Sequence, residues 1–342
     1  MNHCPFLLAL AIATFSFTSC GNKFSSDDIW QISACPPVAL YAKEGRYVAF
    51  CDAVKFEDRY YCVFREGENH APYHEWHMNG YLKVFSSVDL KNWEEELEVR
   101  DPDWDLRDPC LCVAGNMLFL YFGYYSYETP SPDHKTGVVS LETRNGRLCA
   151  GLSKRIDIGA DSNLWLWKVY YDNGYFYGTA YGVNVPLIYV TSDDGMHFRK
   201  VSEISERGEE TSLVNLGDGR KVAIIRSVIP KGDSDVAISS PPYTKWDVFS
   251  LKEMIESPES FTYHGKVFVV GRSSYGMSLF LLDVDRHEVT PVYNFFASGD
   301  YGDCSYPGVI LEDNRLAVIY YAVNPDTEET CIFQTDLIFL ND

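Results

Sequence analysis

The segment Ser87-Val-Asp-Leu-Lys-Asn-Trp93 recurs in the chain as a serine, an aspartate and an aromatic residue at fixed spacing. Ser192-Asp-Asp-Gly-Met-His-Phe198 repeats the pattern, and Ser240-Pro-Pro-Tyr-Thr-Lys-Trp246 keeps its serine and its aromatic residue. Each copy separates two short apolar runs, which is the place of a loop between two strands. The polar residues predict a fixed turn, and the aromatic residue predicts a plug that closes a repeated β-unit.

Tight turns also recur between the apolar runs. Short runs rich in Val, Ile, Tyr, Phe and Trp alternate with these turns, and helical periodicity is nearly absent. Hairpin turns follow one another at intervals of about 45 to 58 residues, which is the period of propeller blades. The six turns are Glu57-Asp58, Gly115-Asn116, Asp172-Asn173-Gly174, Gly217-Asp218-Gly219, His264-Gly265 and Asp313-Asn314.

Six hairpins, each followed by two further strands, predict an all-β fold. We expect a six-bladed β-propeller with four-stranded antiparallel blades over residues 29–342, in one domain without a linker. The last blade has strands at 309–311, 316–321 and 331–340, and so lacks one. A segment near Ile29–Ser33 or Val38–Tyr41 would supply the missing strand and close the ring.

The composition excludes some partners. The 342 residues include 29 Lys+Arg against 49 Asp+Glu, a formal net charge of −20, which disfavours binding to nucleic acids or anionic lipids. The 24 Tyr, 20 Phe and 7 Trp suit strands and sugar-stacking surfaces. We expect no metal and no cofactor, because His74-Glu-Trp-His77 and Cys110-Leu-Cys112 lack the spacing of zinc sites. We also expect a monomer.

The N-terminus has the pattern of a targeting segment. The apolar run Phe6–Phe17 is too short to span a bilayer. It is followed by Thr-Ser-Cys20-Gly, which resembles a bacterial lipobox and predicts a signal over residues 1–20 with a lipid on Cys20. Residues 21–28 would be a polar tether. We therefore expect an outer membrane lipoprotein, at the cell surface or in the periplasm; an ordinary secretory signal is the alternative.

Polar residues at the axis are the candidate site, because ligands bind there in propellers and blade packing does not explain them. Arg65, Arg226 and Arg272 end second strands, with Glu66 beside the first. An acidic protein that gathers arginines at one place is expected to bind an anionic group, and structural pairing with carboxylates is the alternative. The expected starts of innermost strands are Asp52, Arg107-Asp108, Trp165–Lys168, Glu209-Glu210, Phe261–His264 and Asp303–Tyr306.

Two aromatic segments add to this site. The loop 69–77 contains His70, which could act as a general acid or base, and Tyr73 and Trp76, which could contact sugar. Trp165 and Trp167 alternate, so we expect both rings on one face. They would form either a floor on which a sugar stacks or part of the core between blades.

The ordered set of motifs resembles the sialidase superfamily, specifically bacterial exo-sialidase-like propellers, over nearly the whole mature chain. The serine–aspartate–aromatic repeats resemble the Asp-boxes of that family. The resemblance implies an exo-acting glycoside hydrolase that removes a terminal, acidic sugar from a glycan. The other motifs are FREGENH (64–70), DLRDP (105–109), WLWK (165–168), GEETS (208–212), PPYTKW (241–246), GRSS (271–274) and GDCSYPG (302–308).

The resemblance also implies roles for individual residues. Glu210 would activate Tyr306 as the nucleophile, and Arg226 and Arg272 would bind the substrate. A neutral phenol suits that role because it attacks beside a substrate carboxylate without like-charge repulsion. Two departures stand out. The segment that corresponds to the first arginine of sialidases is 49–52 (Ala-Phe-Cys-Asp), so Arg65 or Arg107 would complete the set. The acid/base residue has no clear match, and Glu66, His70 and Glu75 are candidates.

Other functions remain open on the same residues. The segment from Asp52 to Trp93 resembles the first blade of furanosidases and related propeller glycosidases. That resemblance implies catalysis by Asp52, Asp108 and Glu210. A propeller lyase would use His70 and Tyr306, and a surface lipoprotein could bind glycans without catalysis. Glu210 is shared by both hydrolase schemes.

Overall fold

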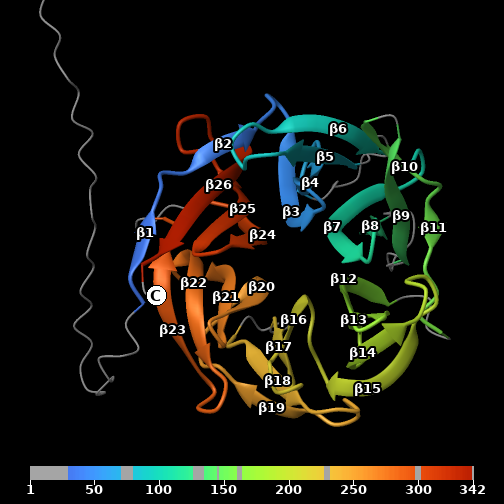
Figure 1. Cartoon of the computed structure of the whole chain (residues 1–342), viewed down its shortest axis with the longest axis vertical. Helices are drawn as coiled ribbons and strands as arrows, with labels where there is room; N and C mark the ends of the chain where they lie inside the picture. Colours follow the sequence, from blue (N-terminus) through green and yellow to red (C-terminus); the bar gives the residue numbers. More distant parts are fainter. Residues whose placement is uncertain are drawn as a thin grey trace, which may run out of the picture.

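Six antiparallel sheets form a ring around a central axis (Figure 1). The computed structural model describes residues 30–70, 80–125, 135–144, 146–159, 164–226, 232–296 and 302–340. The six-bladed propeller is confirmed, and all six expected hairpin turns join the first and second strands of a blade. The expected signal, Cys20, the tether and loop residues 71–79 lie outside the described residues. In the described ranges, no helix is long and apolar enough to cross a membrane.

Each of the first five blades takes its strands in chain order from the axis outward, and β11 is an additional strand of blade two. Blade one consists of β3 (Tyr47–Phe56), β4 (Arg59–Gly67), β5 (Tyr81–Ser87) and β6 (Glu94–Val99). Blade two consists of β7 (Asp105–Ala114), β8 (Met117–Tyr125), β9 (Lys135–Arg144), β10 (Arg147–Ala150) and β11 (Lys154–Arg155). Blade three consists of β12 (Trp165–Asp172), β13 (Tyr175–Tyr181), β14 (Leu187–Ser192) and β15 (Arg199–Ser205). Blade four consists of β16 (Thr211–Asn215), β17 (Lys221–Ile225), β18 (Asp235–Ser239) and β19 (Asp247–Ser250). Blade five consists of β20 (Glu256–Tyr263), β21 (Lys266–Ser273), β22 (Gly276–Asp283) and β23 (Glu288–Asn294).

Blade six joins the two ends of the described chain. Its inner strands are β24 (Cys304–Glu312), β25 (Arg315–Val323) and β26 (Thr330–Phe339). Both β1 (Ile32–Ala34) and β2 (Val38–Tyr41) pair with β26, with Ser33 opposite Ile338 and Val38 opposite Gln334. The predicted closing strand is therefore present, and both proposed segments contribute to it.

The Asp-box loops have the expected place between third and fourth strands. Asp89 Oδ1 accepts the backbone N–H groups of Lys91 and Asn92, each at 2.9 Å, and these hydrogen bonds hold the pKa of Asp89 well below its usual range. Trp93 donates from Nε1 to Gln334 in blade six at 2.9 Å. The turn therefore fixes the plug, and the plug links neighbouring blades.

The apolar core lies between neighbouring blades. Val63 and Leu82 of blade one pack in one cluster with Leu120 and Phe122 of blade two, and the other blade pairs are joined in the same way. Six of the eight cysteines outside the expected signal are buried, and each of the eight is a free thiol. These buried thiols pack as small apolar groups.

Most innermost strands have a β-bulge near their start. The register shifts in β3, β7, β12, β20 and β24. At four of these bulges a non-glycine residue has a positive φ: Phe50 (58°), Asp108 (45°), Ser257 (47°) and Tyr306 (50°). A proline follows each of the last three. A bulge breaks the alternation of a strand and redirects a side chain, and such backbone strain is concentrated at functional sites.

Candidate functional site

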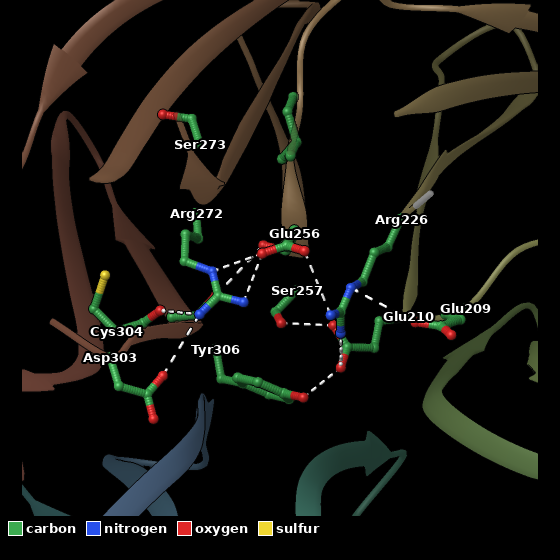
Figure 2. A network of polar contacts seen from close by, with 12 residues as sticks. Glu209, Glu210, Arg226, Glu256, Ser257, Arg272, Ser273, Asp303, Cys304 and Tyr306 are labelled. Carbon is green, nitrogen blue, oxygen red and sulfur yellow. Dashed lines mark hydrogen bonds and ion pairs between the residues drawn. The ribbon is translucent and has the colours of Figure 1, made fainter. Parts of the chain in front are cut away.

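Side chains from the bulges of different blades meet at the axis. The ring of Tyr306 lies 4.8 Å from that of Phe50 and 6.0 Å from that of Trp167, both edge-on. Tyr306 donates its phenol hydrogen to Glu210 Oε1, and Ser257 donates to Glu210 Oε2 at 2.6 Å. Figure 2 shows this dyad, with the Tyr306 hydroxyl directed at Glu210. The two residues that the resemblance paired are therefore in contact.

Arg226 and Arg272 lie beside the dyad and share Glu256 (Figure 2). Arg226 Nη1 is 2.7 Å from Glu210 Oε1. This ion pair orients Glu210 toward the Tyr306 phenol. The Arg226 and Arg272 side chains remain 20% and 24% exposed, and both guanidinium groups are engaged by carboxylates of the chain.

Tyr306 remains a phenol in this environment. Burial raises its pKa well above the usual value, and the nearby charges of Asp108 and Glu210 raise it further. Since Glu210 already accepts the phenol hydrogen, it can take the proton as the oxygen attacks.

Asp108 has the properties of a general acid. Its carboxyl group is buried, and Oδ1 has no hydrogen-bond partner among the described residues. Burial raises the pKa of Asp108 to about 7; Arg107 opposes the shift and Glu210 adds to it. A carboxyl group that titrates near neutral pH beside a nucleophile can give up a proton and take it back.

A second polar cluster forms the rim toward blades one and six. Asp303 accepts hydrogen bonds from Tyr47, from Tyr321 at 2.9 Å and from His70 Nδ1 at 2.9 Å. Burial is the largest influence on Asp303 and raises its pKa, but hydrogen bonds from His70 and Tyr47 outweigh burial and lower it to about 2. The cluster places His70 at the rim rather than beside the dyad.

Two predicted site residues are paired away from the dyad. Arg65 is fully buried and forms a two-point pair with Asp105, at 2.9 and 2.5 Å. Glu66 accepts from Tyr41 at 2.7 Å and from Lys43 at 2.8 Å. Burial opposes ionisation of Glu66, but the hydrogen bonds from Lys43 and its neighbours lower its pKa to about 2. Both residues therefore act as links within the scaffold.

Asp52 lies in a buried charge triad that spans three blades. Lys168 of blade three contacts Asp52 of blade one at 3.4 Å and also Glu259 of blade five. Asp52 Oδ2 also accepts the backbone N–H of Leu111 at 2.6 Å. With both its oxygens engaged, Asp52 is fixed as part of this triad, which we call the axial triad.

The two tryptophans are separated by the bulge in β12. Trp165 pairs with Tyr181 in the sheet and its ring stacks on that residue, with centroids 6.5 Å apart. Its ring also lies against Gly123 of blade two, whereas Trp167 packs against Tyr306. Strict alternation does not hold here: Trp167 adjoins Tyr306, and Trp165 is buried between Tyr181 and Gly123 of blade two.

Arg107 also reaches the axis. Its Nη2 donates to the His70 carbonyl at 3.2 Å, and its guanidinium group lies over the rings of Phe50 and Tyr125. Of the four predicted arginines, the structure therefore places Arg107, Arg226 and Arg272 around the axis.

The sequence did not single out Glu256, Ser257 or Tyr47. Phe261–His264 was expected to begin the innermost strand of blade five, but the strand begins at Glu256 and those residues form its far end. The residue-plus-proline pattern at Ser257-Pro258, Asp108-Pro109 and Tyr306-Pro307 is the signal that would have located these bulges. In the described ranges, no cluster of three or more His, Cys, Asp or Glu could hold a metal ion.

Proteins of known structure share this fold. No protein-family model and no curated protein sequence matches the chain. A solved structure of a protein of unknown function from Dyadobacter fermentans matches with a TM-score of 0.75 at 17% identity, over 90% of this chain and 99% of that one. The NanB sialidase from Streptococcus pneumoniae matches with a TM-score of 0.61 at 12% identity, over 86% of this chain and 68% of that one.

A Trypanosoma rangeli sialidase in complex with sialic acid matches with a TM-score of 0.60 at 12% identity. The match covers 86% of this chain but only 54% of that sialidase. The chain has the fold of the sialidases. The fold that the motifs predicted is confirmed, and identities this low show the fold alone.

Proposed function

We propose that the protein is a retaining exo-glycoside hydrolase that removes a terminal sugar from glycans. The observation that carries this proposal is the hydrogen bond from Tyr306 to Glu210 at the propeller axis. Sialidases are among the proteins that share the fold, which agrees with glycan chemistry at this place. Asp108, which also lies at a bulge of an innermost strand, supplies the acid that the reaction needs.

The reaction divides into two displacements. The phenol oxygen of Tyr306 attacks the anomeric carbon and passes its proton to Glu210, while Asp108 protonates the leaving oxygen. In the second step the Asp108 carboxylate takes a proton from water, and the water oxygen attacks the anomeric carbon. Tyr306 leaves and recovers its proton from Glu210. Each residue returns to its starting state, and the sugar keeps its anomeric configuration.

The closed end of the axis supports exo action. The axial triad of Asp52, Lys168 and Glu259 is buried and joins three blades across the axis. Trp167, next to Lys168 in the chain, packs against Tyr306 and is itself buried. Because these buried side chains join blades across the axis, a glycan chain could not pass through the propeller, and we expect the site to accept the end of a chain.

The other schemes fit these contacts less well. The furanosidase scheme needs Asp52 as a base or nucleophile, but both oxygens of Asp52 are engaged in the axial triad. A lyase would use His70 with Tyr306, yet the ring of Phe50 packs against both His70 and Tyr306. Lipidation of Cys20, an outer membrane location and a monomeric chain remain predictions from the sequence. The acidic charge of the sugar was predicted from four arginines, of which three lie at the axis.

A substrate panel tests the proposal. The panel includes aryl glycosides and oligosaccharides that end in neutral sugars, uronic acids or sialic acid. We expect release of a terminal sugar by the wild-type protein and a loss of at least about 10³-fold in kcat for Glu210→Gln and Tyr306→Phe. Tyr275→Phe, which removes the hydroxyl of an exposed tyrosine, is the matched control and should retain activity. Full activity of both site variants would overturn the proposal.

A further inference from the structure

The guanidinium group of Arg272 is already bound to a carboxylate of the chain. Its Nη2 and Nε atoms contact Glu256 Oε2 at 2.6 and 2.8 Å (Figure 2). Its Nη1 atom is 3.4 Å from the Cys304 carbonyl and 3.5 Å from Asp303. The edge with which arginine binds a carboxylate at two points is therefore occupied by Glu256.

Arg226 is engaged in a similar way. Its three nitrogens lie 2.7 Å from Glu210, 3.4 Å from Glu256 and 3.7 Å from Glu209. Glu256 thus gives one oxygen to each arginine and is itself only 3% exposed. It stands between the two guanidinium groups, where the carboxylate of a bound ligand would have to lie.

The charges around the pocket are already unbalanced toward negative. Arg226 and Arg272 are the cations of this network, while Glu209, Glu210, Glu256 and Asp303 are its carboxyl groups. A ligand carboxylate would add a further negative charge in a partly buried place, which is costly without a new counter-charge. A neutral sugar instead develops positive charge as its glycosidic bond breaks, and these carboxylates would stabilise that charge.

The other arginines leave the carboxyl groups in excess, because Asp105 neutralises Arg65 and Arg107 adds only a third cation against the four carboxyl groups. Arg65 is fully buried with Asp105, so neither group can meet a ligand. Arg107 lies beside Asp108 and packs over the rings of Phe50 and Tyr125. Phe50, the bulge residue of blade one, places an apolar ring against Tyr306 rather than a cationic group.

We propose that the pocket selects a neutral terminal sugar over one that carries a carboxylate, and that Glu256 determines this selectivity. The part of this inference that concerns turnover rests on the proposed function. The part that concerns binding does not, because the arginine contacts are present whether or not the protein cleaves its ligand.

Binding measurements with Glu256 variants test the inference. The probes are N-acetylneuraminic acid and glucuronic acid, with galactose and glucose as neutral sugars, titrated calorimetrically into the protein at constant salt. Wild type should bind the two sugar acids no better than the neutral sugars. Glu256→Ala removes the carboxylate that both arginines share and should bind the acids at least tenfold more tightly than wild type. Glu288→Ala, on exposed strand β23, is the matched control and should show no gain.

Each result of these titrations either supports or overturns the inference that Glu256 determines selectivity. A gain in acid binding for Glu256→Ala supports the inference even if the substrate panel shows no hydrolysis, in which case the proposed function fails alone. If Glu256→Ala does not fold, Glu256→Gln removes the charge with little change in shape and should show a smaller gain of the same sign. Tight binding of N-acetylneuraminic acid by wild type, or no gain in a folded variant, would overturn the inference.

Discussion

Asp108 combines three features that a purely structural residue does not need. Its backbone has a φ of 45°, its Oδ1 atom has no hydrogen-bond partner among the described residues, and burial raises its pKa to about 7. Each of these costs stability, since strained backbone and unsatisfied buried groups are both unfavourable. Together they are the properties expected of a proton donor, and its charge acts on the Tyr306 phenol.

The pH dependence of turnover follows from this residue. The acid must be protonated in the free enzyme, so kcat/KM should fall as the pH rises through about 7. In Asp108→Asn, the fall of kcat/KM at high pH should disappear. With substrates whose leaving group needs protonation, kcat/KM should also drop by at least about 10²-fold. A pH–rate profile with an alkyl glycoside checks this, and an unchanged fall at high pH in the variant would assign the acid to another group.

The same substitution should stabilise the folded protein. A carboxyl group whose pKa is about 7 when folded and near 3.9 when unfolded makes the wild type less stable as the pH rises from about 4 to about 7. Asparagine lacks this titration and tolerates a positive φ. Asp108→Asn should therefore gain as much as about 4 kcal/mol at pH 8 and little at pH 4. Urea unfolding at both pH values checks the sign, and an equal effect at each would contradict it.

At the scale of elements, the local signals of the sequence predicted the blades. All six hairpin turns and the Asp-box loops are determined by residues within about ten positions, and the structure has them where the sequence placed them. The missing strand of blade six could be predicted because β26 required a partner. These features depend on short segments, which a single sequence displays directly.

The side chains of the site could be predicted only in part. Glu210 and Tyr306 were paired correctly through the resemblance, but no local pattern shows that Arg65 is neutralised by Asp105, 40 positions away. Bulges add a second difficulty, because they break the two-residue alternation by which a strand's faces are assigned. For that reason the sequence put Trp165 and Trp167 on one face and missed Glu256 at the axis.

The Asp-box turn provides a test at this scale. Asp89→Ala removes the acceptor for two backbone N–H groups of the loop that carries Trp93. Thermal unfolding should shift down by a few degrees, with kcat unchanged because the loop lies between the outer strands of blade one. Asp103→Ala, another exposed aspartate, serves as the control. Loss of activity without loss of stability would argue against a purely structural loop.

At the scale of the whole molecule, the axial triad joins blades one, three and five across the ring. Lys168 is the only cation in this triad, between Asp52 and Glu259, and all three groups are buried. Like the Tyr306–Glu210 hydrogen bond, which joins blades six and four, the triad connects blades that are not neighbours and so constrains the diameter of the ring.

Lys168→Met should weaken this constraint strongly. Removing the lysine leaves two buried carboxylates without a counter-charge, which should cost about 3–5 kcal/mol in the free energy of unfolding at pH 7. The loss should shrink as the pH is lowered to 5, because burial raises the pKa of Glu259 and removal of Lys168 raises it further, so that this carboxylate takes up a proton. Denaturant unfolding at both pH values measures this, and Lys200→Met on the exposed part of β15 is the control. A loss that does not depend on pH would point to packing instead.

The central claim is that Tyr306, activated by Glu210, attacks the anomeric carbon. The most direct test is to trap the intermediate with an activated 2-deoxy-2-fluoro glycoside of the sugar released in the panel. Fluorine at that position slows both steps, and the good leaving group lets the covalent species accumulate. We expect peptide mass spectrometry to find one glycosyl group on Tyr306 and none in Tyr306→Phe. A glycosyl group on Glu210 or on any other residue of an active enzyme would contradict the account.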